Sequence, residues 1–464
     1  MDPTQVNTGD TAWVLISAAL VLLMTPGLAL FYGGMVRAKS VLNMMMMSFG
    51  ALALISVLWV LYGYSIAFGD DLGLGLVGDP TQYLGLKGLM ADVTGEAGGL
   101  PPMAFVGFQA VFAIITVALI SGAIADRAKF GSWMVFAGIW STLVYFPIAH
   151  WVFDFSAGEH VGGWIANSLV AIDFAGGTAV HINAGAAGLA LALVLGTRRG
   201  FGKDPMRPHN LPLVMVGAGL LWFGWFGFNA GSALAANNLA AVAWVNTLVA
   251  TAAAVLGWLA TERVRDGHAT SLGAASGVVA GLVAITPACS ALSPIGAIVL
   301  GLVAGSLCAL AVGLKYRLGY DDSLDVVGVH LVGGLVGTIG VGFLATSAAP
   351  AAVDGLFYGG GFDHLWRQVV GAVVVMAFSF VATYLIGLAV QKTIGFRIDP
   401  EQEMAGVDLT THAETAYDLH ATAGTRSGIG QGGIGQGSAP AKEHGKEHGK
   451  EHAKEHADER KVRA

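Results

Sequence analysis

Charged residues are scarce in this sequence. Of its 464 residues, 12% are charged and 55% are hydrophobic, whereas a typical soluble domain carries roughly 25% charged residues. A soluble protein of this composition would lack the polar surface needed to cover itself, so most of the chain is expected in a lipid bilayer. The net charge of -7 indicates little about partners, because the charges lie in the loops and the tail.

Cysteines are rare and the common catalytic motifs are missing. Cys289 and Cys308, the only two cysteines, lie in or beside apolar segments and form neither a disulfide framework nor a metal-binding motif. Neither H-E-x-x-H nor G-x-S-x-G occurs, so no catalytic residue can be named. We therefore expect no enzyme, no cofactor, no metal site and no nucleic-acid partner. The first residues are acidic rather than basic, which argues against a cleavable signal peptide.

Long apolar segments, by contrast, fill most of the chain. A membrane-spanning helix needs about 20 mostly apolar residues, and glycine, with 67 residues, lets such helices pack closely in a bilayer. The sequence predicts an all-α integral membrane protein with eleven transmembrane helices. They are expected near 11–34, 41–68, 101–125, 130–151, 176–196, 211–233, 238–261, 270–287, 293–314, 327–348 and 366–391.

Lysine and arginine alternate between the two sides of this predicted bundle. Fourteen lie on one side and two, Lys87 and Arg367, on the other, while the remaining eight of the 24 lie in the tail. Because cytoplasmic loops carry an excess of positive charge, the N-terminus is predicted outside the cell and the C-terminus inside. The predicted cytoplasmic residues are Arg37, Lys39, Arg127, Lys129, Arg198, Arg199, Lys203, Arg207, Arg263, Arg265, Lys315, Arg317, Lys392 and Arg397.

The chain contains a weak internal repeat. Asp173 precedes His181 by eight residues at the start of the fifth segment, and Asp322 precedes His330 by eight at the start of the tenth. Small residues follow both histidines. Since each half would hold five spans, the second half is expected to be inverted, giving a five-plus-five repeat and one further helix.

His181 and His330 are the foremost candidate functional residues, because ionisable side chains within spans are costly. Burial favours the neutral imidazole, which has one donor and one acceptor nitrogen. Two such rings at equivalent places in inverted repeats would lie near the midplane and line a narrow path. The alternative is two core histidines that are satisfied independently. Without a third ligand the pair is a poor zinc site.

Asp173 and two phenylalanines are further candidates. Asp173 begins the run DFAGGTAVH and either caps a helix or contacts a cation near an outer entrance. Phe112 and Phe228 are candidates for a stacked pore plug, since aromatic faces attract cations and apolar constrictions gate by dewetting. The alternative for each phenylalanine is ordinary helix or lipid packing.

These residues lie in motifs that resemble the Amt/Rh ammonium transporter family, specifically its bacterial Amt branch. The resemblance covers about residues 10–420, in order and over many separate motifs. The sequence differs from the family pattern in the 421–464 extension and in local loops. The motifs are PGLALFYGGMVRAKSVLNM (26–44), ITVALISGAIADRAKF (115–130), FPIAHW (146–151), DFAGGTAVHINAGAAGLALALVLGTRR (173–199), KDPMRPHNLP (203–212), GWFGFNAGSA (224–233), GVVAGLVAITPAC (277–289) and DDSLDVVGVHLVGGLVGT (321–338).

The resemblance implies a homotrimer with one conduction path in each subunit, and an inverted five-plus-five core with an eleventh, bracing helix. It places twin pore histidines at His181 and His330 and a stacked gate at Phe112 and Phe228. Trp225 would line the pore.

An outer ammonium site is implied as well. It would include Ser232, whose hydroxyl accepts a hydrogen bond from ammonium, together with Phe112 and Phe153. Asp173 would support this site largely from a distance, as a structural residue. The family often has a tryptophan where this chain has Phe153, followed here by DFSAGEHVGG. Phenylalanine is the weaker cation–π partner, and Trp151 is out of register with that position.

The chain divides into three predicted regions. Residues 1–391 form the transmembrane transporter domain, and 392–420 form a cytoplasmic regulatory segment that resembles the family's binding site for PII-type signalling proteins. Residues 421–464 form a Gly/Ser-rich linker and a Lys/Glu/His-rich tail, which are expected to be disordered. The histidines of that tail are a weak candidate for metal binding.

The function expected from these features is ammonium uptake into a bacterial cell across its inner (plasma) membrane. Ammonium, or its analogue methylammonium, would lose a proton at the outer site and cross as a neutral amine, with the proton following along the histidine pair in a net electrogenic process. The alternatives are an ammonium sensor that signals through its cytoplasmic tail, a channel for another neutral gas such as carbon dioxide, as in the Rh branch, and, last, an enzyme.

Overall fold

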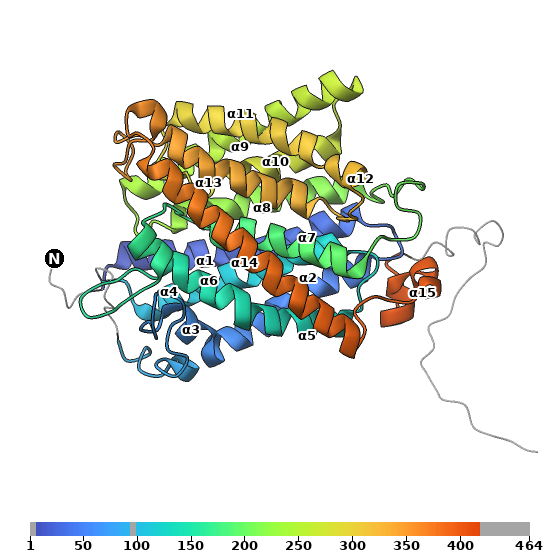
Figure 1. The fold of residues 1–464 in the computed structure, drawn as a ribbon, viewed down its shortest axis with the longest axis horizontal. Helices are drawn as coiled ribbons and strands as arrows, with labels where there is room; N and C mark the ends of the chain where they lie inside the picture. The colour runs from blue at the N-terminus through green and yellow to red at the C-terminus, as the bar shows by residue number, and fades with distance from the viewer. Residues whose placement is uncertain (1–5, 93–98, 418–464) are drawn as a thin grey trace, which may run out of the picture. The chain divides into compact units, whose positions relative to one another are not determined.

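A computed structural model describes residues 6–92 and 99–417. Within these residues the chain is helical, and its only extended pairings are isolated bridges such as Asp71–Gly78 and Ala157–His160. The helices run side by side as a bundle, with the start of α1 and the C-terminal α15 at opposite ends (Figure 1). The predicted 421–464 tail lies outside the described residues.

The first half of the bundle contains five apolar spans, several of them interrupted by a π-helical or 3-10 turn (η). They are α1 (Thr8–Met35); α2 (Val41–Leu58) continued by η1 (Trp59–Gly63) and α3 (Tyr64–Phe68); α4 (Pro102–Ile120) with η3 (Ser121–Ile124); α5 (Phe130–Trp140), η4 (Ser141–Tyr145) and α6 (Phe146–Phe153); and η6 (Gly177–Ile182) with α7 (Asn183–Leu195).

The second half contains six more apolar segments. They are α8 (Leu211–Gly231), α9 (Asn238–Asp266), α10 (Ser271–Ile285), α11 (Pro294–Ala311) with α12 (Leu314–Leu318), η7 (Val327–Leu331) with α13 (Val332–Leu344), and α14 (Asp363–Thr393). Short turns η2 (Leu84–Leu86), η5 (Ile165–Leu169) and η8 (Leu356–Tyr358) lie in the loops, and α15 (Pro400–Ala405) and η9 (Asp408–His412) follow the last span.

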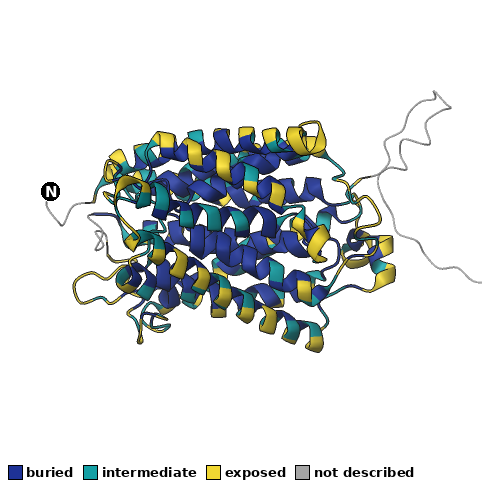
Figure 2. Cartoon of the chain, turned by 45° about the horizontal axis from the view of Figure 1, so that its top comes forward, coloured by how far each residue is buried: buried dark blue, intermediate teal, exposed yellow. Residues whose placement is uncertain are grey.

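The predicted all-helical membrane fold is confirmed. Ten of the described helical stretches are long and apolar enough to cross a membrane, and α10 is shorter. The predicted segment 270–287 is helical from Ser271 to Ile285, and Pro287, which has no N–H to donate to the preceding turn, follows this end. Buried residues line the middle of the bundle and exposed ones its margins (Figure 2).

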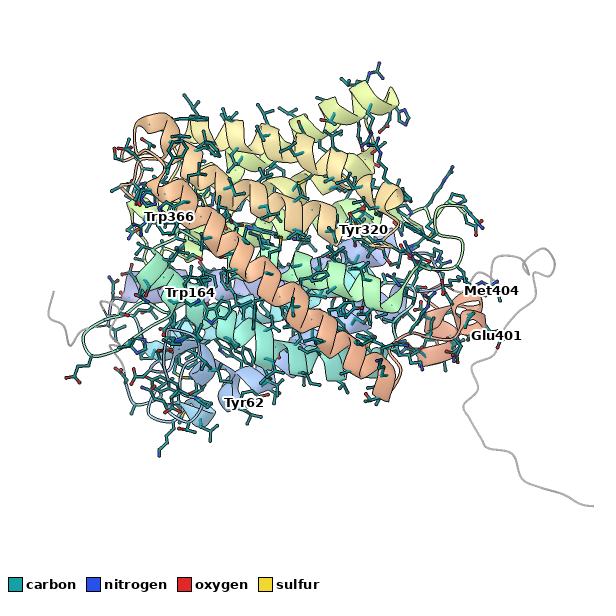
Figure 3. The ribbon with its side chains drawn as sticks, in the orientation of Figure 1. Tyr62, Trp164, Tyr320, Trp366, Glu401 and Met404 are labelled. Atoms are coloured by element: carbon teal, nitrogen blue, oxygen red, sulfur yellow. The ribbon has the colours of Figure 1, made fainter. Side chains whose placement is uncertain are left out.

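Aromatic side chains mark both ends of the bundle. Trp164 and Trp366 lie towards the end at which α1 begins, and Tyr320 lies towards the opposite end (Figure 3). Such aromatic positions are typical of the two membrane–water interfaces. α14 runs obliquely across the bundle and contacts α5, α7 and α13 (Figure 1), which is the bracing arrangement expected for the last span.

The segment after α14 is held against helix ends at the end of the bundle opposite the start of α1 (Figure 1). The Asp408 carboxylate accepts from the backbone N–H groups of Leu42 (3.0 Å) and Asn43 (2.8 Å), which lie in the first turn of α2. The Tyr417 hydroxyl lies 2.8 Å from Nε2 of His209. These contacts order residues 394–417 on the surface that the sequence predicts to be cytoplasmic.

α9 and α11 pack backbone to backbone. A Cβ atom added to Gly305 of α11 would lie 2.0 Å from the carbonyl oxygen of Ala254 in α9. We therefore expect Gly305→Ala to force the two helices apart and to lower the free energy of unfolding by about 2 kcal/mol or more.

Thermal unfolding of the detergent-solubilised protein measures this effect. Gly219→Ala is the matched control, because a Cβ at this position in α8 meets nothing within 4 Å and alanine is the better helix former. Equal melting temperatures for the two variants would contradict the packing argument.

Candidate functional site

His181 and His330 meet in the interior of the bundle. Their Nδ1 atoms lie 3.3 Å apart, and the ring planes are inclined by only 22°. The two residues are 1% and 2% exposed. The fold thus brings together two histidines that are 149 positions apart in the chain and shields both from solvent.

The pairing depends on a reciprocal close approach of two helices. A Cβ atom on Gly185 would lie 2.4 Å from the backbone nitrogen of Leu331, and a Cβ on Gly334 would lie 3.0 Å from the Ile182 side chain. Each glycine stands four residues after one histidine and packs against the residue that follows the other. The small residues that follow both histidines therefore let the two backbones come close enough for the rings to touch.

Two carboxylates hold the π-helical turns that carry the histidines. Asp173 accepts from the backbone N–H groups of Gly176 (2.8 Å), Gly177 (2.5 Å) and Thr178 (2.7 Å), and also from the Thr178 hydroxyl. Asp322 likewise accepts from Val326 (3.1 Å) and Val327 (2.7 Å) ahead of His330. Each aspartate satisfies free N–H groups at a helix start, where negative charge is favoured.

The contact between the two Nδ1 atoms constrains where the protons lie. One Nδ1 must donate and the other must accept, so the pair shares one proton between its facing nitrogens. The two Nε2 atoms are then unlike: one carries a hydrogen and the other a free lone pair. Nε2 of His181 is buried without a hydrogen-bond partner among the described residues, so it can bind a small polar molecule.

The histidine pair lines a narrow cavity of about 10 Å³, close to the space that one water-sized molecule requires. The other walls of this cavity come from α1, α4, α8 and α10 and are apolar. They include Met24, Leu28, Ile115, Leu119, Leu221 and Val279. An ion would lose its water here without gaining carboxylate or carbonyl ligands, which is costly.

Aromatic rings extend from this cavity towards the end at which α1 begins. Phe112 and Phe228 are stacked, with ring centroids 4.2 Å apart, and both are fully buried. The Trp225 ring stacks on His181 at 5.3 Å, and its Nε1 donates to the Thr286 hydroxyl (2.8 Å). The predicted gate and pore-lining residues thus form one continuous column with the first histidine.

The predicted outer-site residues lie around the Phe112–Phe228 stack. Phe153 meets Phe112 edge to face, with centroids 6.4 Å apart. The Ser232 hydroxyl donates to the carbonyl oxygen of Phe228 (2.8 Å), so its lone pairs stay available to an N–H donor. Trp151 instead donates to the carbonyl oxygen of Leu76 (2.7 Å). It therefore does not take the place of the missing tryptophan.

Sequence reasoning did not find the apolar walls or the Thr286 hydroxyl that anchors Trp225. The walls carry no signal of their own, because Leu and Ile in an apolar helix look the same whether they face lipid, another helix or a cavity. Thr286 lies in one of the family-like motifs, but only the fold brings it to Trp225.

Comparison with known proteins gives close matches over nearly the whole chain. A family model described as the Ammonium Transporter Family matches residues 12–417. An ammonium transporter of Mycobacterium tuberculosis is 63% identical over 439 residues, which cover 90% of this chain and 92% of that protein. An ammonium transporter of Bacillus subtilis is 45% identical over 411 residues and 88% of this chain, and 98% of that protein is covered.

Solved structures agree with this match. A protein described as a sensor Amt protein has a TM-score of 0.81 at 28% identity, covering 88% of this chain and 99% of that one. Mep2 of Saccharomyces cerevisiae has a TM-score of 0.77 at 33% identity, covering 86% of this chain and 90% of that one.

Replacing Asp173 tests its role as a helix cap. Asp173→Ala removes the acceptor for several backbone N–H groups ahead of His181, so we expect the free energy of unfolding to fall by about 2 kcal/mol. Thermal unfolding measures the change. Asp204→Asn, in an exposed loop at the opposite end of the bundle, is the control. An Asp173→Ala protein as stable as wild type would exclude a capping role.

Proposed function

The chain belongs to the ammonium transporter family, and on this premise we propose that it takes up ammonium and passes it through each subunit as ammonia. The observation that carries this proposal is the buried histidine pair in an otherwise apolar cavity of single-molecule width. A path of this kind suits a neutral amine that can both donate and accept a hydrogen bond.

Selection against potassium follows from the chemistry of the cavity. Potassium and ammonium carry the same charge, but potassium cannot lose a proton or donate a hydrogen bond. A dehydrated cation between apolar walls costs several kcal/mol or more. Ammonium avoids this cost by leaving a proton behind, and the ammonia that remains donates to the lone pair of a neutral imidazole.

The outer site supplies the first contact. The hydroxyl of Ser232 accepts from ammonium, and the faces of Phe112 and Phe153 attract the cation. Asp173 supports the site as a structural residue and does not contact the cation, because its carboxylate oxygens accept hydrogen bonds from the backbone N–H groups that follow it. The Phe112–Phe228 stack then separates this site from the cavity and opens to admit the amine.

The proton follows the amine by way of the histidine pair. The two Nδ1 atoms are in hydrogen-bond reach, so a proton arriving on one ring can be relayed to the other while a second proton leaves from the far Nε2. Transport by this route moves one positive charge with each ammonia and is electrogenic.

The setting proposed for this activity is a homotrimer in the cell inner membrane, with the N-terminus outside and residues 392–420 as a cytoplasmic regulatory segment. A PII-type signalling protein at that face is the proposed regulatory partner. The described part of the segment supports this role, because its contacts with α2 and His209 link it to the ends of the spans.

A second candidate function is ammonium sensing through the same segment. It is favoured by the ordered docking of residues 394–417 and by the fold shared with a sensor Amt protein. A complete conduction path would be unnecessary for a pure sensor, so transport is the primary proposal. A transport-dead His181→Asp protein that still signals in cells would favour sensing.

Uptake of methylammonium into proteoliposomes tests the transport proposal. We expect His181→Ala and His330→Ala each to lower the initial rate about tenfold or more, because the loss of a hydrogen-bond partner in a dry path costs about 1–3 kcal/mol. His268→Ala, in an exposed loop, is the matched control. Each variant is checked for folding by its melting temperature, and unchanged rates in folded variants would refute the twin-histidine path.

Charge movement is tested on the same proteoliposomes. A jump in external ammonium should give a transient inward positive current in wild type, and in His181→Ala the current should fall in proportion to the rate of uptake. Uptake without current would show that ammonia crosses alone and that the proton returns to the outside.

A further inference from the structure

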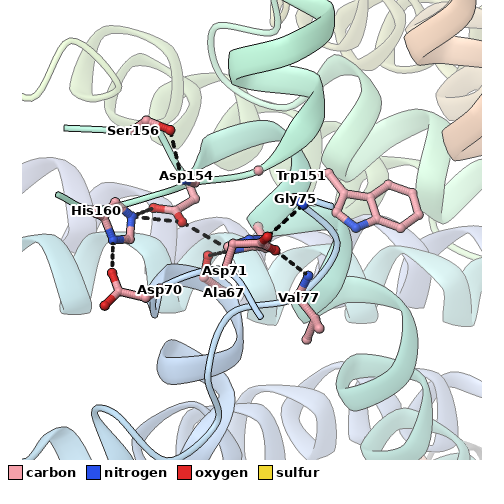
Figure 4. A network of polar contacts seen from close by, with 12 residues as sticks. Ala67, Asp70, Asp71, Gly75, Val77, Trp151, Asp154, Ser156 and His160 are labelled. Atoms are coloured by element: carbon pink, nitrogen blue, oxygen red, sulfur yellow. Dashed lines mark hydrogen bonds and ion pairs between the residues drawn. The ribbon is translucent and has the colours of Figure 1, made fainter. Parts of the chain in front are cut away.

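A chain of alternating carboxylates and imidazoles lies beside the outer end of α6. Nδ1 of His160 is 2.6 Å from Oδ1 of Asp70, and Nε2 is 2.9 Å from Oδ1 of Asp154 (Figure 4). His160 therefore bridges the loop that follows α3 and the residue that follows α6. Both of its partners are carboxylates, so both nitrogens donate when the ring is a cation.

His150 extends this chain into the bundle. Its Nδ1 lies 3.1 Å from Oδ2 of Asp154 and 3.2 Å from the carbonyl oxygen of Ala67, and its Nε2 lies 3.3 Å from Oδ1 of Asp71. All three partners offer oxygen atoms that can accept a hydrogen bond. We call Asp70, His160, Asp154, His150 and Asp71 the outer clasp.

Asp154 is the centre of the outer clasp. Besides its contacts with both histidines, its carbonyl oxygen accepts from the backbone N–H of Gly163 (2.9 Å) and from Nδ2 of Asn167 (2.9 Å). The residue directly after α6 is thus held from several directions. The clasp also fixes the loop beyond α3, because Asp71 accepts from the N–H groups of Gly75 (2.9 Å) and Val77 (3.4 Å).

The residue placed by this arrangement is Phe153, the immediate neighbour of Asp154. Phe153 is half-buried and meets Phe112 of the proposed outer site edge to face. Among the described residues, the hydrogen bonds of the outer clasp continue to Gly75, Val77 and Gln82. The Ser232 hydroxyl of the proposed outer site donates instead to Phe228. The clasp is therefore suited to holding an aromatic ring in place and not to carrying protons from the site.

We propose that the outer clasp is a positioning device for Phe153, and that protonated His160 keeps this ring aligned for binding the ammonium ion. This inference rests on the proposed transport function and assigns to it a control by external pH. With His160 cationic, Asp70 and Asp154 are drawn together and the end of α6 is fixed. With His160 neutral, one of the two bonds loses its hydrogen and the end of α6 loosens.

The charges that face His160 support this assignment. Asp154 comes from the end of α6 and Asp70 from the loop after α3, with His150 and Asp71 behind them and the exposed Glu159 next in the chain. Burial alone would lower the pKa of His160, but the hydrogen bonds and charges of Asp154 and Asp70 outweigh it, and the net pKa shift is upward. The clasp is thus fully formed below the ordinary histidine pKa and is lost as pH rises through the raised pKa.

The test measures KM and maximal rate of methylammonium uptake by the full chain in proteoliposomes, at external pH from about 5.5 to about 8. Methylammonium stays protonated throughout this range. In wild type we expect KM to rise about two- to fivefold as pH increases, the change expected when a cation–aromatic contact weakens, with little change in maximal rate.

Two substitutions of His160 separate charge from structure. His160→Arg keeps a permanent charge and a forked donor for both carboxylates, so its KM should stay low at every pH. His160→Gln is neutral, so its KM should stay high at every pH. Glu159→Gln removes a neighbouring exposed charge and should keep the wild-type profile.

Other outcomes would overturn the inference. A pH-dependent KM that survives in His160→Gln assigns the control to another group, and a pH-independent KM in wild type shows that no such control operates. A change in maximal rate alone would show that the clasp does not act on binding. Failure of wild type to take up methylammonium would instead refute the proposed function.

Discussion

The reciprocal contact between the η6–α7 and η7–α13 segments is the constraint on which the rest of this structure depends. Gly185 and Gly334 let the backbone of each segment approach the residue that follows the other segment's histidine. The two imidazoles then meet through Nδ1 at 3.3 Å. A larger residue at either glycine would part the segments, and the histidines would each need another partner in an apolar interior.

The polar groups of the bundle are distributed so that the cavity stays free of fixed charge. Asp173 and Asp322 lie at the starts of η6 and η7, where backbone N–H groups occupy their oxygens. The described ion pairs of Arg198 with Asp126 and Asp321 lie beyond the C-terminal ends of α7, η3 and α12. Between these ends, the cavity offers a permeant molecule apolar walls and two imidazoles, which is a surface for a neutral amine and a barrier for an ion.

The outer end of the path follows a different principle. Its aromatic residues come from α4, α6 and α8 and are not joined by a short repeat, so their positions depend on what holds each helix end. For Phe153 this support is the outer clasp, in which His160 and Asp154 belong to the loop DFSAGEHVGG that follows Phe153. This loop thereby becomes part of the support of the proposed binding site.

Composition and hydropathy were enough to predict the membrane fold, because a helix in lipid must be apolar over a defined length. The eight-residue Asp–His spacing and the family-like motifs singled out two histidines and two phenylalanines, and the structure brings each pair into contact. The sequence could not reveal the apolar cavity walls, the Trp225–Thr286 bond or the outer clasp. These depend on which faces of packed helices and which loop residues meet in space, and sequence periodicity does not distinguish a lipid-facing leucine from one that lines a path. The residues thus determined the spans and the chemical groups available, whereas tertiary packing decided which of those groups touch.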